Sequence, residues 1–204
     1  MRRLCSLAPV IPVLVVRDAA IAAPLAEALV GGGLPVIEVT LRTDAALDAI
    51  GAMSRVTGGI VGAGTLLSAE DVRRARDAGA AFGVSPGATD SILQAAEDVG
   101  LPMMPGAVTA TEVMALRERG YDMLKFFPAE TSGGAAAVRA LAGPLREVEF
   151  CPTGGISPAT APQYLCLDNV RCVGGSWIVR DDLVSACDWA AIRERAAEAA
   201  RLRS

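Results

Sequence analysis

Short β-branched runs alternate with longer Ala-rich stretches along the whole chain. The short runs predict strands, and the Ala-rich stretches predict helices. The predicted strands cover residues 10–16, 35–41, 60–64, 81–85, 103–106, 123–127, 148–153 and 170–174. The predicted helices cover residues 19–31, 44–55, 68–79, 89–99, 109–118, 133–142, 157–166 and 188–202.

Residues suited to helix ends stand at many of these boundaries. Candidate N-terminal caps are Thr43 or Asp44, Ser68, Thr89, Thr109, and Ser157 followed by Pro158 at the first helical position. Glycine stands where three helices should end, at Gly79, Gly100 and Gly120.

Strict alternation of strand and helix predicts a parallel sheet. Eight such units suggest that the sheet closes into a (β/α)8 TIM barrel. No linker or low-complexity tract divides residues 1–204, so we expect a single domain. The alternative is an open doubly wound sheet, which is less favoured because no GxGxxG motif follows the first strand.

Charge and composition argue against two classes of partner. The formal net charge is −4, the arginines are scattered and 4% of the residues are aromatic, so we expect no nucleic-acid partner. The hydrophobic content of 52% is spread over short runs. Because no uncharged run reaches the length of a membrane span, we expect no membrane partner.

The cysteines and the N-terminus indicate a cytoplasmic protein. Five irregularly spaced cysteines suggest reduced thiols that pack as small hydrophobic side chains. Since the chain has no histidine and no CxxC pair, we expect no metal. The first 16 residues have the outline of a signal peptide, but Pro9 and Pro12 interrupt the apolar run and no clear cleavage site follows, which favours a first core strand.

Lys125 is the only lysine among 19 basic side chains, and its neighbours in the sequence are apolar. An arginine stays protonated, whereas a lysine desolvated by apolar neighbours can lose its proton and attack a carbonyl. Alternation along the second and sixth strands turns Glu38 and, if the strand continues, Arg42 to the same interior as Lys125. This pattern indicates a catalytic group at the carboxyl ends of barrel strands, and a purely structural Glu38–Lys125 ion pair is the alternative. The alternation also turns Val36, Thr40, Met123 and Phe127 inward, and Ile37, Val39, Leu41, Leu124 and Phe126 toward the helices.

Two glycine-bearing turns follow the seventh and eighth predicted strands. The first is Thr153-Gly154-Gly155, and the second is Gly174-Gly175-Ser176. In a (β/α)8 barrel the loops at these two positions often bind phosphate through backbone N–H groups, and glycine allows the close approach. The turns therefore predict a phosphate site, with hydroxyl donors from Thr153 and Ser176.

Six segments carry a resemblance to a known family. They are EVTLRT (38–43), VGAGT (61–65), SPG (85–87), KFFPAE (125–130), CPTGGI (151–156) and GGSW (174–177). In this order the chain resembles the 2-dehydro-3-deoxy-6-phosphogluconate (KDPG) aldolases, class I pyruvate aldolases of the Entner–Doudoroff route. Members of that family often carry a longer helix before the first strand, so the resemblance leaves open how the barrel bottom is closed here.

The resemblance implies a role for each candidate residue. Lys125 would form a Schiff base with the C2 ketone, and Glu38 would transfer protons. Arg42 and Thr65 would hold the pyruvyl carboxylate, and Pro86 would line the pocket. The phosphate would be received by Thr153, Gly154, Gly155, Gly175 and Ser176. A homotrimer that needs neither a cofactor nor a metal is also implied.

Several alternatives remain open from the sequence. Relatives of this family cleave the C4 epimer (KDPGal) or 4-hydroxy-2-oxoglutarate. A phosphosugar isomerase or epimerase could share the phosphate loops, but it would not need a lysine in an apolar strand. A non-catalytic binding module would not be expected to keep Glu38, Arg42 and Lys125 together.

Overall fold

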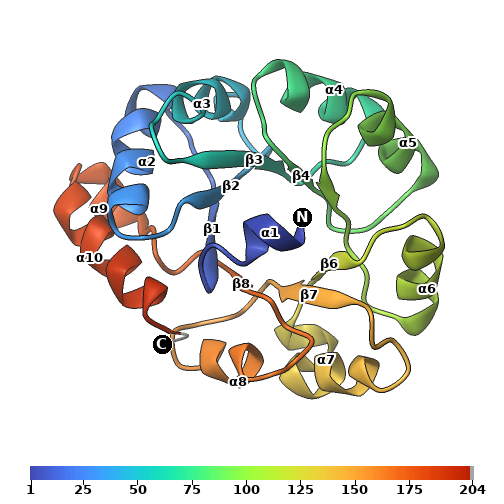
Figure 1. The fold of residues 1–204 in the computed structure, drawn as a ribbon. Helices are drawn as coiled ribbons and strands as arrows, with labels where there is room; N and C mark the ends of the chain where they lie inside the picture. The colour runs from blue at the N-terminus through green and yellow to red at the C-terminus, as the bar shows by residue number, and fades with distance from the viewer. Residues whose placement is uncertain (203–204) are drawn as a thin grey trace.

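Strands and helices alternate through the computed structural model, which describes residues 1–202 (Figure 1). The strands are β1 (Val10–Leu14), β2 (Val36–Thr40), β3 (Ile60–Gly64), β4 (Gly83–Val84), β5 (Met103–Met104), β6 (Met123–Phe126), β7 (Glu149–Pro152) and β8 (Val173–Gly175). Each predicted strand is present, and most are shorter than predicted at one or both ends.

The helices lie outside the strands, with one exception. The outer elements are η1 (Ala19–Ile21), α2 (Ala22–Gly31), α3 (Ala46–Met53), α4 (Ala69–Asp77), α5 (Asp90–Asp98), α6 (Ala110–Glu118), η2 (Glu130–Ser132), α7 (Gly134–Ala142), α8 (Ala161–Leu165), α9 (Asp181–Ser185) and α10 (Trp189–Ala200). The exception is α1 (Arg2–Cys5), which lies across the centre of the ring in Figure 1. Neither α1 nor α9 was predicted, because four or five residues are too few for a periodic pattern.

The strands form a curled parallel arrangement. Six of them make one sheet in the order β5-β4-β3-β2-β1-β8, and β6 and β7 make a separate two-stranded sheet. Three isolated parallel bridges, Gly106↔Lys125, Phe150↔Val170 and Thr153↔Gly174, connect the two sheets. The predicted parallel α/β architecture is confirmed, and its continuous sheet contains six strands instead of eight.

Most of the predicted helix ends are confirmed. The side chains of Ser68, Thr89 and Thr109 each accept a hydrogen bond from a backbone N–H in the first turn of α4, α5 and α6. Glu112 completes a capping box with Thr109. Gly79, Gly100 and Gly120 each follow the last residue of these helices by two positions.

Two predicted helix starts are wrong. The hydroxyl of Thr43 donates to the carbonyl of Val16 instead of capping a helix, and α3 starts at Ala46. Ser157 and Thr160 hydrogen bond to each other across a turn, so α8 starts at Ala161 instead of Pro158. In both cases a hydroxyl has a partner that a sequence pattern does not reveal.

The core has two layers, as the alternation predicted. The inner layer, enclosed by the strands, contains Cys5, Ile11, Val36, Phe82, Val84, Met104, Met123, Cys151 and Cys172. The outer layer, between strands and helices, contains Ile37, Val39, Leu124 and Phe126 among many others. Within residues 1–202, no helix is long and apolar enough to cross a membrane.

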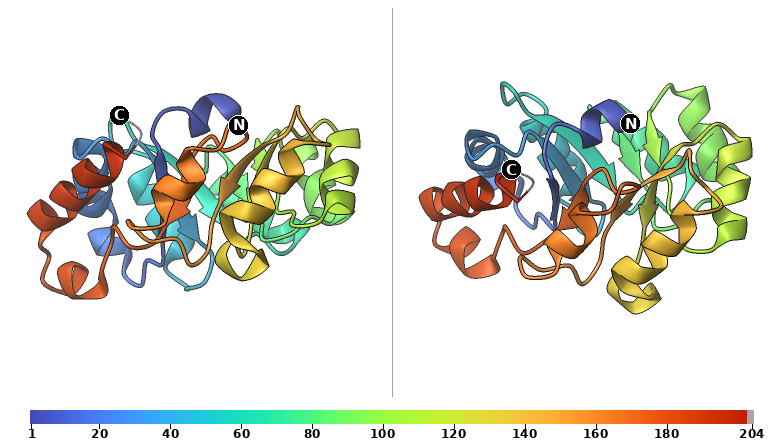
Figure 2. Two further views of the ribbon diagram at one scale, coloured as in Figure 1. Left: turned by 90° about the horizontal axis from the view of Figure 1, so that it is seen from below. Right: turned by 60° about the horizontal axis from the view of Figure 1, so that its bottom comes forward.

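Helix α1 covers the ring at the amino ends of the strands, as the two views in Figure 2 show. Cys5 is fully buried in the inner layer, where its sulfur lies 3.9 Å from that of Met104. This short helix covers the amino ends of the strands, the point that the family resemblance leaves open.

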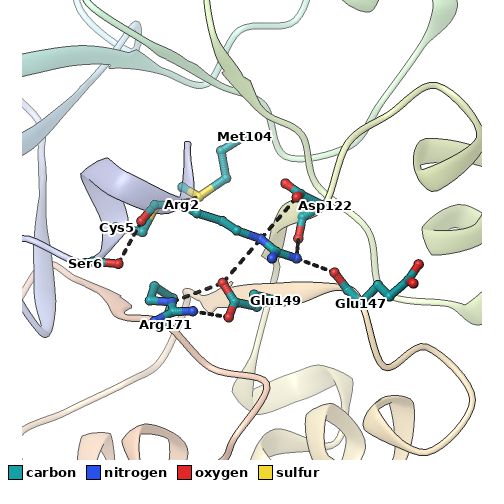
Figure 3. A network of polar contacts seen from close by, with 8 residues as sticks. All are labelled: Arg2, Cys5, Ser6, Met104, Asp122, Glu147, Glu149 and Arg171. Atoms are coloured by element: carbon teal, nitrogen blue, oxygen red, sulfur yellow. Dashed lines mark hydrogen bonds and ion pairs between the residues drawn. The ribbon is translucent and has the colours of Figure 1, made fainter.

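Arg2 fixes α1 to the β6–β7 pair (Figure 3). Its Nε lies 3.1 Å from a carboxylate oxygen of Asp122, just before β6, and 3.4 Å from one of Glu149, in β7. Its guanidinium also donates to the carbonyl of Glu147. Arg171 joins Glu149 from the other side, with Nε at 3.0 Å from Oε2. One side chain therefore links the first helix to two strands that follow more than 100 residues later.

Replacing Arg2 should destabilise the protein. Arg2→Met keeps the apolar stem of the side chain but removes its hydrogen bonds. Because the site is half-exposed, we expect the free energy of unfolding to fall by only about 1–2 kcal/mol. Urea titration should show a lower midpoint for Arg2→Met than for Arg3→Met, because Arg3 is exposed. Equal midpoints would show that the Arg2 contacts contribute nothing.

Candidate active site

Lys125 and Glu38 meet inside the ring of strands. The Lys125 Nζ lies 3.1 Å from Oε1 of Glu38, and the two residues are 5% and 1% exposed. Lys125 is in β6 and Glu38 is in β2, which are not neighbours in either sheet. The side chains therefore meet across the interior, as the alternation of both strands predicted.

Apolar and aromatic groups surround the lysine. Its ammonium lies 5.3 Å from the centroid of the Phe127 ring, within the range of a cation–π contact. Its partner residue in β7, Cys151, is buried in the inner layer, whereas the neighbouring Leu124 and Phe126 face the helices. Water has little access to this amine, so Glu38 is its available partner for proton transfer.

Gly64 provides the space for the Glu38 carboxylate. A Cβ at residue 64 would lie 2.1 Å from Oε1 of Glu38, which is far inside contact distance. Thr40, two residues after Glu38, is also buried, and its hydroxyl donates to the carbonyl of Leu14 at 2.7 Å. The position of the carboxylate thus depends on a glycine in the neighbouring strand.

Thr65 has an unusual backbone conformation. Its φ is +61°, although it is a β-branched residue. This left-handed conformation carries a conformational free-energy penalty for β-branched residues, and residues that adopt it cluster at functional sites. Thr65 directly follows β3, so its strained backbone lies at the carboxyl end of that strand, next to the glycine that accommodates the Glu38 carboxylate.

Pro86 and Gly106 bring two neighbouring loops together. Pro86 is half-buried after β4, and a Cβ at residue 106 would lie 2.1 Å from its carbonyl oxygen. Gly106 also forms the bridge to Lys125. Gly106 therefore lies between the backbone of Pro86 and the strand that carries the lysine.

Arg42 does not join the buried pair. Strand β2 ends at Thr40, and the Arg42 N–H donates to the Thr40 carbonyl at 2.8 Å, so the alternation stops before Arg42. Its side chain is exposed and lines a hollow of about 430 Å³ with Asp71 and Arg74. In the described part of the chain, no interaction links Arg42 to Glu38 or Lys125.

The two glycine-bearing turns lie side by side. Thr153 is bridged to Gly174, and a Cβ at residue 174 would lie 2.3 Å from Oγ1 of Thr153. Gly154 and Gly155 have φ values of +104° and +79°, which other residues rarely adopt. Among residues 1–202, no backbone carbonyl accepts a hydrogen bond from the amide of Gly154 or Gly155. These amides are suited to bind an anion.

Ser176 lines a cavity of about 650 Å³ at the ends of β1 and β8. Arg17 and Asp18 lie on its β1 side. Sequence reasoning missed Arg17, although its position just after the first predicted strand was a usable signal. Because β1 and β8 are neighbours in the sheet, a cation after β1 lies near the turn after β8.

The described residues contain no group of three His, Cys, Asp or Glu side chains arranged to hold a metal ion.

Comparison with known proteins identifies the family. The sequence model of the aldolase family described as KDPG and KHG aldolase matches residues 1–195. The chain belongs to this family of aldolases. It is 50% identical over 192 residues to the 2-dehydro-3-deoxy-phosphogluconate aldolase of Pseudoalteromonas atlantica, covering 94% of this chain and 89% of that one. It is 48% identical to the KHG/KDPG aldolase of Escherichia coli K12, covering 94% and 90%.

Solved structures show the same similarity. The 2-keto-3-deoxy-6-phospho-gluconate aldolase of Zymomonas mobilis superposes with a TM-score of 0.94 at 48% identity, covering 98% of this chain and 96% of that one. The KDPG aldolase of Legionella pneumophila was solved with pyruvate captured as a covalent carbinolamine intermediate. It also superposes with a TM-score of 0.94, at 40% identity, covering 98% of this chain and 97% of that one.

Filling the space at residue 64 should disturb the buried pair. Gly64→Ala places a methyl group on the Glu38 carboxylate, and overpacking of this kind typically lowers the free energy of unfolding by about 1–3 kcal/mol. Gly143→Ala is the control, because the nearest atom to its added Cβ lies 3.9 Å away. The prediction fails if both variants unfold at the same urea concentration.

Proposed function

We propose that this chain is a class I aldolase that cleaves KDPG into pyruvate and glyceraldehyde 3-phosphate, the aldol step of the Entner–Doudoroff pathway. The observation that carries the proposal is the buried contact of 3.1 Å between the only lysine and a carboxylate. The names of relatives that share up to about half of its sequence support the same reaction.

Lys125 is the proposed nucleophile. Once Glu38 has accepted a proton from it, the amine attacks the C2 ketone to give a carbinolamine. Glu38 returns that proton to the departing hydroxyl, so the carbinolamine loses water to give a protonated imine and Glu38 is again a carboxylate. The imine withdraws electrons, so the C3–C4 bond breaks when the C4 hydroxyl gives its proton to Glu38. Glyceraldehyde 3-phosphate leaves and an enamine remains on Lys125. The carbinolamine captured in the Legionella relative supports the first of these steps.

Glu38 is the proposed proton carrier in the second half of the reaction. It returns its proton to the C3 methylene carbon of the enamine, which gives the imine of pyruvate. Water then hydrolyses this imine and frees the lysine. The protonated imine on Lys125 is the electron sink of the reaction, so we expect no metal and no cofactor to take part.

The two ends of the substrate are proposed to bind at different loops. Arg42 and Thr65 hold the pyruvyl carboxylate, which requires the exposed Arg42 side chain to turn inward when substrate binds. Pro86 lines the pocket. The phosphate is received by Thr153, Gly154, Gly155, Gly175 and Ser176, and the cavity that Ser176 shares with Arg17 suggests that this arginine adds a positive charge.

The assembly of the molecule is part of the proposal. Residues 1–204, of which the last two lie outside the described residues, form one domain whose strands close into a (β/α)8 barrel. The three isolated bridges between the sheets support the closure. We further propose a cytoplasmic homotrimer that binds small molecules only.

A second substrate has specific support. The Escherichia coli relative is named for both KHG and KDPG, which favours additional activity on 4-hydroxy-2-oxoglutarate. The C4 epimer KDPGal is less favoured, since a native KDPGal structure is 25% identical to this chain. Steady-state cleavage of the three substrates side by side decides among them.

The nucleophile can be trapped. Pyruvate with borohydride should add one three-carbon unit to Lys125, and peptide mapping is unambiguous because the α-amino group is the only other amine in the chain. Lys125→Arg should lose both labelling and cleavage, since a guanidinium stays protonated. A label found only on Met1, or full activity in Lys125→Arg, would reject the Schiff-base mechanism.

The role of Glu38 can be separated from that of Lys125. Glu38→Gln keeps the shape of the side chain but removes the base. It should form the pyruvate adduct more slowly, and lose methyl-proton exchange of pyruvate and turnover by about 10²–10⁴-fold. Exchange at the wild-type rate, followed by proton NMR in deuterium oxide, would leave Glu38 without a catalytic role.

A further inference from the structure

The loop that contains Gly154 and Gly155 lies along the segment that follows the lysine strand. Beyond the end of the β6–β7 pair, the N–H of Ala129 donates to the carbonyl of Thr153 at 2.8 Å. The N–H of Glu130 then donates to the carbonyl of Gly154 at 3.1 Å. These two hydrogen bonds turn the carbonyls of Thr153 and Gly154 toward the backbone of residues 129–130.

The side chain of Glu130 packs against the backbone of the same loop. A Cβ at residue 155 would lie 2.7 Å from Cγ of Glu130, so the loop backbone rests directly on this side chain. The phenol of Tyr164, in α8, donates a hydrogen bond of 2.5 Å to Oε1 of Glu130. Glu130 is thus held between the loop and a fixed donor.

Tyr164 is suited to hold this carboxylate. It is 1% exposed, so the surrounding core fixes its ring. Burial, together with its hydrogen bond to Glu130, raises the pKa of the phenol well above its ordinary value, so the hydroxyl remains a donor at neutral pH. A carboxylate beside an anion-binding loop would repel a phosphate, and the hydrogen bond restrains the carboxylate in one orientation.

We propose that Glu130 and Tyr164 are a positioning pair that sets the shape of residues 153–155 for the phosphate group of the substrate. Neither residue touches the reacting atoms. This inference rests on the proposed function, because it assigns the loop to a phosphorylated substrate. The pair should therefore control phosphate binding and leave the chemistry at Lys125 unchanged.

Two variants of the pair separate its hydrogen bond from its bulk. Tyr164→Phe keeps the ring in the core but removes the donor. Glu130→Gln keeps an acceptor for Tyr164, whereas Glu130→Ala removes both the acceptor and the surface on which Gly155 rests. The matched control is Tyr121→Phe, since Tyr121 is the other tyrosine of the chain and donates to Glu97 at 3.3 Å.

The test combines three measurements on the whole chain of residues 1–204. Calorimetric titration with 3-phosphoglycerate measures phosphate binding without requiring turnover, exchange of the pyruvate methyl protons reports on Lys125 and Glu38, and thermal unfolding reports on the fold. For Tyr164→Phe and Glu130→Ala we expect binding weakened by about 10-fold, the lower end of what loss of a hydrogen bond to a charged group costs. Pyruvate exchange should stay at the wild-type rate, and Glu130→Gln and Tyr121→Phe should bind as the wild type does.

Each other outcome is decisive. Unchanged binding in Tyr164→Phe, or no binding of 3-phosphoglycerate to the wild type, overturns the inference. If binding, exchange and the unfolding temperature fall together, the pair is a structural contact and the inference is again wrong. If wild-type protein binds 3-phosphoglycerate but does not exchange pyruvate protons, the proposed function fails, while the titrations still decide the role of the pair.

Discussion

The contact between Lys125 and Glu38 is the constraint on which the rest of the structure depends. Moving an ammonium or a carboxylate into a protein interior carries a penalty of several kcal/mol for each ion, and only a well-placed partner offsets it. Here the partners come from strands on different sheets, so the ring of strands must keep its curvature for the contact to form. Gly64 is part of this requirement, because any side chain there would occupy the space of the carboxylate.

The amino and carboxyl ends of the strands differ in structure and in role. At the amino ends, α1 and the Arg2 contacts close the interior over apolar and thiol side chains. At the carboxyl ends the chain places glycines, an exposed serine and the strained Thr65. Close packing supports stability at the first end, whereas the second end keeps backbone amides available for a ligand. The same separation is found in (β/α)8 barrels, whose active sites lie at the carboxyl ends of the strands.

Much of the fold and the centre of the site were predictable because strand alternation is strict. A period of two was enough to bring Glu38 and Lys125 together, and to separate Val36 and Met123 from the helix-facing residues. The prediction failed where regular structure stops. Arg42 lies beyond the end of β2, and a loop side chain has no period from which its direction follows.

Contacts between distant segments were also beyond reach. The hydroxyl of Thr43 bonds to Val16, so it does not cap α3. Arg17 is different, because the predicted barrel already made the first and last strands neighbours, and its place after the first strand could have pointed to Ser176. Helix α1 was too short to produce a pattern, although Arg2 is the residue that joins it to β6 and β7.

The division of the strands into two sheets has a mechanical consequence for the proposed reaction. Lys125 belongs to the β6–β7 pair, whereas Glu38 belongs to the six-stranded sheet. A substrate attached to Lys125 would therefore be anchored at its imine to one sheet, while its proton carrier belongs to the other. The proposed phosphate site takes residues from both sides, since Thr153 follows β7 and Gly175 is in β8. The bridges between the sheets thus help to set both the distance of proton transfer and the shape of the phosphate site.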